Sequence, residues 1–325
     1  MNAALKPVPD PDIAYPAHYS TDDVSLIDDI KAWLAEHDYK QAALARLARV
    51  STSSLSQILN GSYATPPGKL LANVASAMQH AEGTATDSVP AVETSVFRLA
   101  LTAFQMARRN RNFSVLSAHV GTGKTFAAKH YQRTTPNTYL LEATPTMTVQ
   151  SMIKVLARMI IGADAKGSID DKFRQITTTL ANTDSLLIVD EAETLTAHVL
   201  HTLRRVRDLA NIGIALVGTE YLTGLIKPVS GQFDQIRSRT LFWPETVSQI
   251  TQEDAAALIQ AAFGAEDVPE AVIARLYDYS KGSARMLVEG LVAAVKQMRG
   301  DRELSIDMID FVAVKGMSLK ALPKK

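Results

Sequence analysis

One short run of residues constrains the fold of this chain more than any other feature. Residues 113 to 117 are mostly apolar, and they lead directly into the run Ala118-His119-Val120-Gly121-Thr122-Gly123-Lys124-Thr125, which opens a segment of helical character. A glycine-rich turn between a strand and a helix gathers successive backbone N–H groups at the positive end of the helix dipole, an arrangement that suits a phosphate chain. Gly121 and Gly123 let the backbone approach closely. The pattern predicts a nucleotide-phosphate loop.

The side chains of this loop have separate tasks in such an arrangement. Lys124 reaches the β- and γ-phosphates, and the Thr125 hydroxyl is a ligand for Mg²⁺. Ala118 stands where the usual pattern has its first glycine, a small residue in place of another. A turn of this kind also arises without any ligand, so the interpretation needs a second motif. The residues expected to bind the nucleotide are Val120, Gly121, Thr122, Gly123, Lys124, Thr125, Phe126 and Asp190.

The second motif is an apolar run, residues 185 to 189, that ends in Asp190 and Glu191. A short apolar run indicates a buried parallel strand, and ligands bind at the carboxyl ends of such strands. Asp190 is expected to hold Mg²⁺ through water, and Glu191 to polarise the attacking water as general base. A surface Asp-Glu pair at the start of a helix is the alternative for this run alone. The two motifs in this order predict an ATPase that uses ATP and Mg²⁺.

Glu193 extends the second motif to Asp-Glu-Ala-Glu, a run also found in DEAD-type helicases. A helicase of that type needs two motor domains. The chain has no second set of motor motifs and is too short for both domains, so the sequence argues against this class.

Composition narrows the class further. At 325 residues and 46% hydrophobic content, the chain has enough apolar material for two or three folding units. The absence of cysteine excludes disulfides and thiolate metal sites. No apolar run approaches the roughly 20 residues of a membrane helix, and the first residues do not resemble a signal peptide. We therefore expect a cytoplasmic protein without membrane contact.

Charge is balanced overall but unevenly distributed. Residues 39 to 81 and residues 94 to 141 contain no acidic residue, whereas residues 22 to 38 are strongly acidic. Basic faces attract polyanions, with binding that weakens as salt rises. The alternative is that these basic residues are only solvated at the surface, and the phosphate loop itself accounts for part of the basic charge in residues 94 to 141.

The N-terminal part divides into an arm and a small domain. Residues 1 to 20 hold four prolines and are expected to be an extended arm. Residues 21 to 80 are expected to be helical, with a helix over 41 to 49, a turn, and a second helix over 52 to 59 that ends at Asn60-Gly61. This pattern resembles repressor-like helix-turn-helix domains.

In domains of that kind the second helix enters the DNA major groove. Small hydroxyl side chains read bases weakly, so backbone binding without sequence preference is the expectation, and a three-helix bundle that does not bind DNA is the alternative. The exposed residues expected to face DNA are Thr52, Ser53, Ser54, Ser56 and Gln57.

Residues 81 to 93 are small, polar and punctuated by glycine and proline, which predicts a linker. Residues 94 to 245 alternate between strand-like and helix-like runs, which predicts an α/β domain with a wound parallel sheet. Residues 246 to 314 are expected to form a helical lid, and residues 315 to 325, with four lysines, a basic tail that trails free. The strands are expected near 113 to 118, 138 to 143, 185 to 190, 213 to 219 and 239 to 243.

The order of these features resembles the AAA+ ATPases. With the N-terminal helix-turn-helix, the Gly-Thr-Gly-Lys-Thr loop, Ile-Val-Asp-Glu-Ala and the Lys281-Gly-Ser-Ala-Arg285 run, the chain more closely resembles the B transposition proteins of Mu-like phages. The implied fold is an AAA+ P-loop NTPase with a parallel sheet and a helical lid, preceded by a small all-α domain.

The resemblance implies further catalytic residues. Thr219, after Gly218, stands where the family senses the γ-phosphate, and Glu220 lies beside it. Arg237 and Arg239 stand where the family presents an arginine finger to the neighbouring subunit, and Arg239 is favoured. Arg285, at the start of a lid helix, is the implied second sensor. An ordinary surface ion pair is the alternative for each arginine.

The resemblance also implies partners. ATP-bound subunits of the family polymerise around double-stranded DNA as a helical filament and serve a transposase. The basic residues expected to line the filament are Lys154, Arg158, Arg204, Arg205 and Arg207. His198 and His201 share a helix face but lack a third ligand, which argues against a metal site there.

The function implied is an ATP-dependent, sequence-independent DNA-binding ATPase, stimulated by DNA, that delivers target DNA to a transposase and stimulates strand transfer. A transcription regulator switched by ATP is the alternative. A peptide-remodelling ATPase is a third possibility, and the two segments without acidic residues argue weakly against it.

Overall fold

The chain forms two compact units, residues 1–88 and 89–325. The computed structural model describes residues 15–36, 41–48, 50–86, 92–162, 165–226, 233–300 and 302–323. Each unit has its own hydrophobic core, so the two are described separately. No helix in these ranges is long and apolar enough to cross a bilayer.

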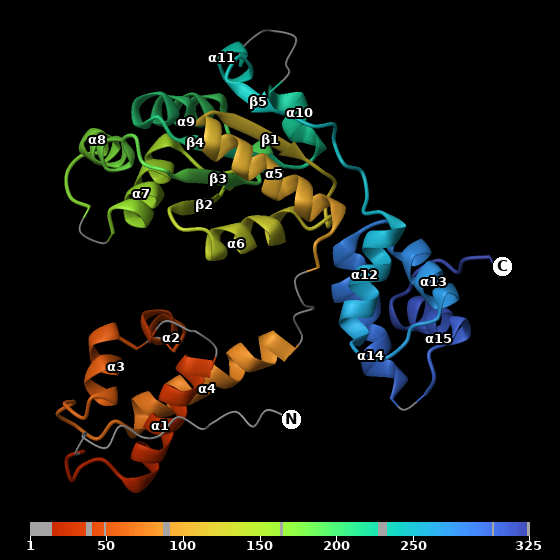
Figure 1. Ribbon diagram of the computed structural model, residues 1–325, viewed down its shortest axis with the longest axis horizontal. Helices are drawn as coiled ribbons and strands as arrows, with labels where there is room; N and C mark the ends of the chain where they lie inside the picture. The colour runs from red at the N-terminus through yellow and green to blue at the C-terminus, as the bar shows by residue number, and fades with distance from the viewer. Residues whose placement is uncertain are drawn as a thin grey trace. The chain divides into compact units, whose positions relative to one another are not determined.

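The N-terminal unit is a small helical domain. It consists of α1 (Thr21–Glu36), α2 (Gln41–Leu47), α3 (Thr52–Leu59) and α4 (Gly68–Thr86) (Figure 1). Ser51 caps α3, because its side chain accepts a hydrogen bond from the Ser54 N–H at 2.9 Å. The predicted helix-turn-helix is therefore present as α2 and α3.

Two boundaries of this unit differ from the sequence prediction. Residues 1–14 of the predicted arm lie outside the described residues, but residues 15–20 pack against the helices: Tyr19 is buried, and its hydroxyl accepts a hydrogen bond from the Tyr63 N–H. At the other end α4 runs to Thr86, into the predicted linker. The sequence contains no proline between Gly68 and Pro90, so nothing in that stretch forces the helix to end at residue 80.

The second unit is built on the predicted parallel sheet. Its order is β2–β3–β4–β1–β5 (Figure 1), and every neighbouring pair is parallel. Every residue of β1, β3 and β4 is buried, as the apolar runs predict. The strands are β1 (Phe113–Ser117), β2 (Thr138–Glu142), β3 (Leu186–Asp190), β4 (Gly213–Gly218) and β5 (Thr240–Phe242).

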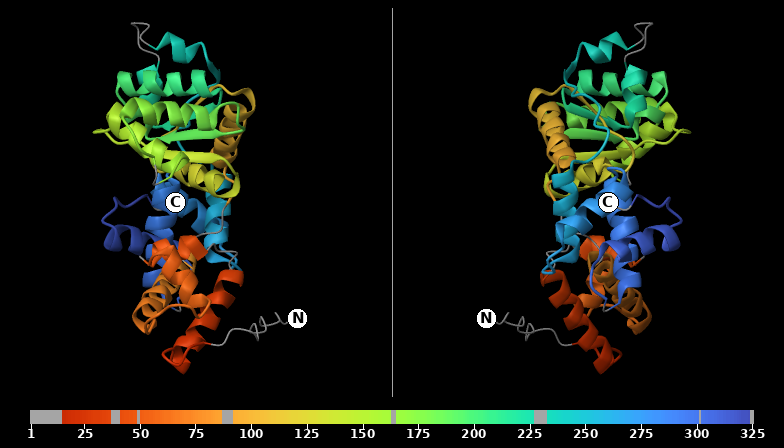
Figure 2. Two further views of the ribbon diagram at one scale, coloured as in Figure 1. Left: turned by 90° about the vertical axis from the view of Figure 1, so that its left-hand side faces the viewer. Right: turned by 90° about the vertical axis from the view of Figure 1, so that its right-hand side faces the viewer.

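Helices cover both faces of the sheet (Figure 2). Alternate strand residues point to opposite faces, so Leu116 and Ile188 pack with α5 (Ser95–Asn110) and α6 (Lys124–Thr134). Val115 and Leu187 face the other side, which carries α7 (Val149–Ile160), α8 (Ile169–Leu180) and α9 (Ala197–Ala210). Two short helices that the sequence reasoning missed, α10 (Glu220–Ile226) and α11 (Asp234–Arg237), precede β5.

The C-terminal helices have a core of their own, as expected for a lid. They are α12 (Gln252–Phe263), α13 (Glu270–Ser280), the π-helical turn Met286–Val292 that continues into α14 (Ala293–Arg299), and α15 (Ile306–Phe311), followed by a second π-helical turn, Val312–Gly316.

The prediction of a free basic tail is wrong for the residues described there. Leu319 and Leu322 pack against the lid core, and the Arg275 guanidinium donates to the Pro323 carbonyl at 2.8 Å. The lysines suggested a solvated segment, but Leu319 and Leu322 between them pack this segment against the lid core.

Candidate nucleotide-binding site

The glycine-rich loop joins β1 to α6 as predicted. Gly121 and Gly123 have φ angles of +81° and +99°, in the left-handed region that favours glycine. Gly123 is the N-cap of α6, and no side chain among the described residues caps this helix. The first-turn N–H groups of α6 therefore lack a side-chain acceptor, which fits a phosphate at this end of the helix.

Lys124 is held in the loop by its own backbone. Its ammonium group donates to the carbonyls of Ala118 at 2.6 Å and His119 at 2.8 Å, and the residue is only 8% exposed. Burial lowers the pKa of Lys124, and the negative charges of Asp190, Glu193 and Glu220 oppose this shift. A desolvated cation that is held by two carbonyl oxygens is suited to exchange them for phosphate oxygens.

The other loop side chains differ in burial. Thr122 is buried and its hydroxyl donates to the His119 carbonyl at 2.9 Å, so it shapes the loop. Thr125 is half-buried in the first turn of α6, while Val120 and Phe126 are exposed apolar side chains on either side of the glycines. The loop thus offers polar groups and two apolar surfaces to a ligand.

Asp190 ends β3 and is 3% exposed. One of its carboxylate oxygens accepts the Glu191 N–H at 3.0 Å, and Glu191 itself has a φ of +55° and is exposed. Asp190 and Thr125 supply oxygen ligands of the kind that Mg²⁺ prefers. In the described ranges no group of three or more histidine or acidic side chains could hold a metal ion by itself. The His201 ring lies beside an aromatic ring instead, 5.7 Å from that of Phe233.

Thr219 lies at the carboxyl end of β4, but it is engaged within the protein. Its hydroxyl donates to Glu193 Oε1 at 2.9 Å. Sequence reasoning noted Glu193 only as part of an acidic run. The second glutamate of the Asp-Glu-Ala-Glu run was visible in the sequence. Its contact with a residue 26 positions away, however, cannot be predicted from any local pattern.

The lid reaches the loop through Arg285. Its backbone N–H donates to the Gly121 carbonyl at 2.9 Å, while its guanidinium is exposed, 3.8 Å from Glu289. A Cβ on Gly121 would lie 2.3 Å from the Ser283 hydroxyl, so the lid leaves no space for a side chain there. The second-sensor candidate therefore adjoins the loop, as the resemblance implies.

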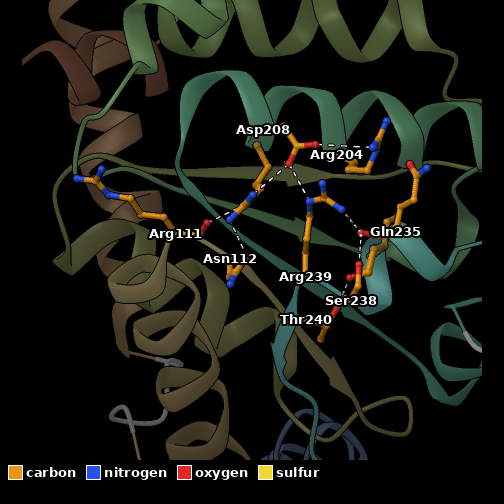
Figure 3. Close-up of polar contacts among 10 residues, drawn as sticks. Arg111, Asn112, Arg204, Asp208, Gln235, Ser238, Arg239 and Thr240 are labelled. Carbon is orange, nitrogen blue, oxygen red and sulfur yellow. Dashed lines mark hydrogen bonds and ion pairs between the residues drawn. The ribbon is translucent and has the colours of Figure 1, made fainter.

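Arg239 lies at the opposite end of the sheet. Its carbonyl accepts from the N–H of Phe113, the first residue of β1, whereas the phosphate loop follows the last residue of that strand. The Arg239 guanidinium donates to Asp208 at 3.0 Å and to the Gln235 carbonyl at 2.9 Å (Figure 3). Arg237 is 47% exposed and pairs with Asp234 at 3.0 Å. Both arginines therefore lie near the amino end of β1, whereas this chain's own phosphate loop follows the carboxyl end of that strand.

The basic residues expected to contact DNA differ in availability. Lys154, Arg158 and Arg205 are exposed, and so are Thr52, Ser53 and Gln57 on α3. Arg207 instead donates to the Arg111 carbonyl at 2.9 Å and to the Asn112 side chain at 2.7 Å. Arg204 lies 3.7 Å from Asp208 (Figure 3). Arg207 therefore ties α9 to the segment before β1.

Comparison with known families fits this geometry. Residues 107–226 match the model of an AAA domain, and residues 30–79 match that of a helix-turn-helix. The chain contains an AAA domain. The AAA match begins in α5 and ends in α10, so it includes the phosphate loop, Asp190 and Thr219.

Curated relatives support the predicted resemblance to B transposition proteins. The chain is 28% identical over 257 residues to "Mu-like prophage FluMu DNA transposition protein B" of Haemophilus influenzae, a match that covers 77% of this chain and 88% of the relative. It is 29% identical over 201 residues to "ATP-dependent target DNA activator B" of Escherichia phage Mu, covering 59% of this chain and 64% of that protein.

Among solved structures, the Aeropyrum pernix ORC1 protein, determined in complex with DNA, has a TM-score of 0.51 at 14% identity, covering 70% of this chain and 67% of that one. At this identity the likeness concerns the fold alone. It agrees with the AAA+ fold that the sequence predicts.

Proposed function

We propose that this AAA protein is an ATPase that binds double-stranded DNA with little regard to sequence, delivers it to a transposase and stimulates strand transfer. One observation carries the proposal. An uncapped helix start, the buried Lys124 and the Asp190 carboxylate meet at the carboxyl end of a parallel sheet, in a chain similar to proteins named for ATP-dependent activation of target DNA.

The proposed reaction is the hydrolysis of ATP to ADP and phosphate. Lys124 and the loop N–H groups bind the β- and γ-phosphates, and Thr125 and Asp190 would hold Mg²⁺, which when bound neutralises phosphate charge. A water oxygen bonds to the γ-phosphorus as the bond to the β–γ bridging oxygen breaks. Glu191, exposed beside Asp190, takes the water proton.

Residues that respond to the γ-phosphate complete the proposed site. Thr219 lies at the end of β4, and Arg285 adjoins the loop from the lid. Arg239, with Arg237 as the alternative, is proposed to act on the nucleotide of a second copy, because it lies at the opposite end of β1 from its own loop. ATP then sits between two copies and holds them together.

The same arrangement supports a filament on DNA. Subunits joined through ATP can repeat without closing, and hydrolysis would remove the joining contact. Exposed basic side chains of the AAA domain, Lys154, Arg158 and Arg205, with Arg204 and Arg207 as lesser candidates, would meet phosphates, as would Thr52, Ser53 and Gln57 of the helix-turn-helix. DNA that orders the filament would stimulate hydrolysis, in the cytoplasm of a bacterial host cell.

Imaging tests the proposal directly. Purified protein is mixed with ATP, Mg²⁺ and random-sequence duplex, beside Lys124→Ala and Glu191→Gln. We expect polymers with wild type, none with Lys124→Ala, and longer-lived polymers with Glu191→Gln, which binds ATP but hydrolyses it slowly. Wild type that remains monomeric on DNA at low salt would refute the proposal.

A further inference from the structure

The two glutamates after Asp190 have different surroundings. Glu191 has a left-handed backbone and is exposed, and its backbone N–H group donates to the Asp190 carboxylate at 3.0 Å. Glu193 lies in the short 3-10 turn Ala192–Thr194, and its carboxylate crosses to the end of β4, where it accepts the Thr219 hydroxyl at 2.9 Å. The side chain engaged across the sheet edge is therefore that of Glu193.

The end of β4 is shaped to admit this carboxylate. Gly218 is the last residue of the strand, and a Cβ built on it would lie 2.3 Å from Glu193 Oε2. Any other residue at position 218 would displace the carboxylate or the strand. The glycine thus allows the Glu193–Thr219 hydrogen bond.

The second oxygen of Glu193 is buried and has no hydrogen-bond partner among the described residues. Its negative charge opposes the effect of burial on the pKa of Lys124, which places the carboxylate in the electrostatic environment of the phosphate loop. A buried carboxylate oxygen without a donor is costly, so the hydrogen bond to Thr219 and the field of Lys124 must offset that cost. Such a group suits a role at the site better than a role in stability alone.

The direction of this hydrogen bond has a chemical consequence. A hydroxyl has one proton and two lone pairs, whereas a carboxylate only accepts. Because Thr219 gives its proton to Glu193, it presents only lone pairs to its other neighbours. A Thr219 held in this way can accept a hydrogen bond from a water molecule but cannot donate one to a phosphate oxygen.

We propose that Glu193 is a positioning residue for ATP hydrolysis: it fixes the Thr219 hydroxyl as an acceptor that holds the attacking water. This inference rests on the proposed ATPase function and assigns Thr219 a different task from donation to the γ-phosphate. Glu191 remains the residue that takes the proton. Glu193 acts only through Thr219.

A double-mutant cycle on the full chain tests the inference. Steady-state hydrolysis is measured for Glu193→Ala, Thr219→Val and the double variant, with the affinities for ATP and ADP measured separately. We expect each single change to lower kcat about tenfold, the value of one ordinary hydrogen bond, and the double variant to lose no more than either. The ratio of ATP to ADP affinity should stay within about threefold of wild type, since a Thr219 that accepts from water makes no bond to the γ-phosphate.

Matched variants distinguish a positioning role of Glu193 from an effect of its charge and from a loss of folding. Glu193→Gln keeps an amide oxygen that can accept the Thr219 proton, so kcat should stay within about threefold of wild type, whereas Glu191→Gln should nearly abolish turnover. Gly218→Ala leaves both partners in place but crowds the carboxylate, and should lower kcat as Glu193→Ala does. Thermal unfolding of each variant checks that the chain still folds.

The inference is overturned by a Glu193→Ala variant as active as wild type, by effects that multiply in the double variant, or by a loss of ATP affinity relative to ADP of more than about tenfold in Thr219→Val. If Glu193→Gln falls as far as Glu191→Gln, Glu193 acts by its charge and the positioning role is also wrong. Wild type that fails to hydrolyse ATP would refute the proposed function instead, so the two failures are distinct.

Discussion

Asp208 is the residue on which three arginines converge. It accepts from Arg239 at 3.0 Å and from Arg207 at 3.1 Å, and Arg204 lies 3.7 Å away (Figure 3). When a guanidinium that is already held on two sides binds a further anion, it loses less side-chain entropy than an unpaired guanidinium would lose. The pair between Arg237 and Asp234 is exposed, and pairs of that kind contribute little. Arg239 is therefore the better oriented of the two arginine-finger candidates.

Mixing two inactive variants tests whether Arg239 acts on a second copy. Arg239→Ala retains its own phosphate loop, and Lys124→Ala retains its arginine. Each alone should lose roughly 10³-fold or more in hydrolysis, while the mixture should recover a substantial part, because the arginine of one copy serves the nucleotide of the other. Hydrolysis by the mixture on duplex DNA is the measurement.

Arg237→Ala is the matched control and should keep most of its activity without mixing. Recovery that depends on the ratio of the two proteins would support a shared site. Full activity of Arg239→Ala by itself would show that this arginine has no part in hydrolysis.

At the scale of elements, α5 lies directly on the backbone of β4. A Cβ on Gly213, the first residue of β4, would be 2.4 Å from the Ala107 carbonyl oxygen and 2.7 Å from the Arg108 nitrogen. Neither backbone atom can rotate away, so Gly213→Ala must move the helix or the strand. We expect a loss of about 3 kcal/mol in the free energy of unfolding, at the upper end of overpacking costs.

Gly224 in α10 provides the comparison for this substitution. Nothing lies within 4 Å of a Cβ built there, so Gly224→Ala should stabilise the helix by about 0.5–1 kcal/mol. Urea unfolding of both variants, with the slope of the transition unchanged, measures the difference. Equal stabilities for the two alanine variants would contradict the close contact between α5 and β4.

The helices and strands also show how much of the structure could be predicted from the sequence. The strands were predictable because buried parallel strands are short apolar runs, such as residues 186–189, that end where polar residues begin. Helices α10 and α11, of 7 and 4 residues, are too short to show a periodic pattern. The motifs after strand ends also indicated the loop and Asp190, whereas Thr219 was indicated by the resemblance to AAA+ ATPases. The Glu193–Thr219 contact and the bonds of Arg207 to Arg111 and Asn112 join residues distant in sequence, and no local pattern encodes them.

On the scale of the whole molecule, the two units have separate cores. Ile27, Leu44, Leu55, Ile58 and Leu71 of the N-terminal unit are fully buried in a hydrophobic core that this unit forms by itself. A unit with its own core can fold alone. Residues 1–88 should therefore give a folded fragment with a cooperative thermal transition in circular dichroism.

That fragment decides between the proposed function and a transcription regulator switched by ATP. The side chains that α3 exposes at Thr52, Ser53 and Gln57 are short or uncharged, and phosphate contacts by such groups carry no base information. We expect duplexes of unrelated sequence to bind residues 1–88 within about threefold of one another, with log K falling by about 0.9 per neutralised phosphate for each tenfold increase in salt. A regulator would instead prefer one sequence by about 10³-fold or more. Fluorescence anisotropy with a panel of duplexes at two salt concentrations makes the distinction, and Gln57→Ala should weaken all members of the panel equally if α3 binds only the backbone.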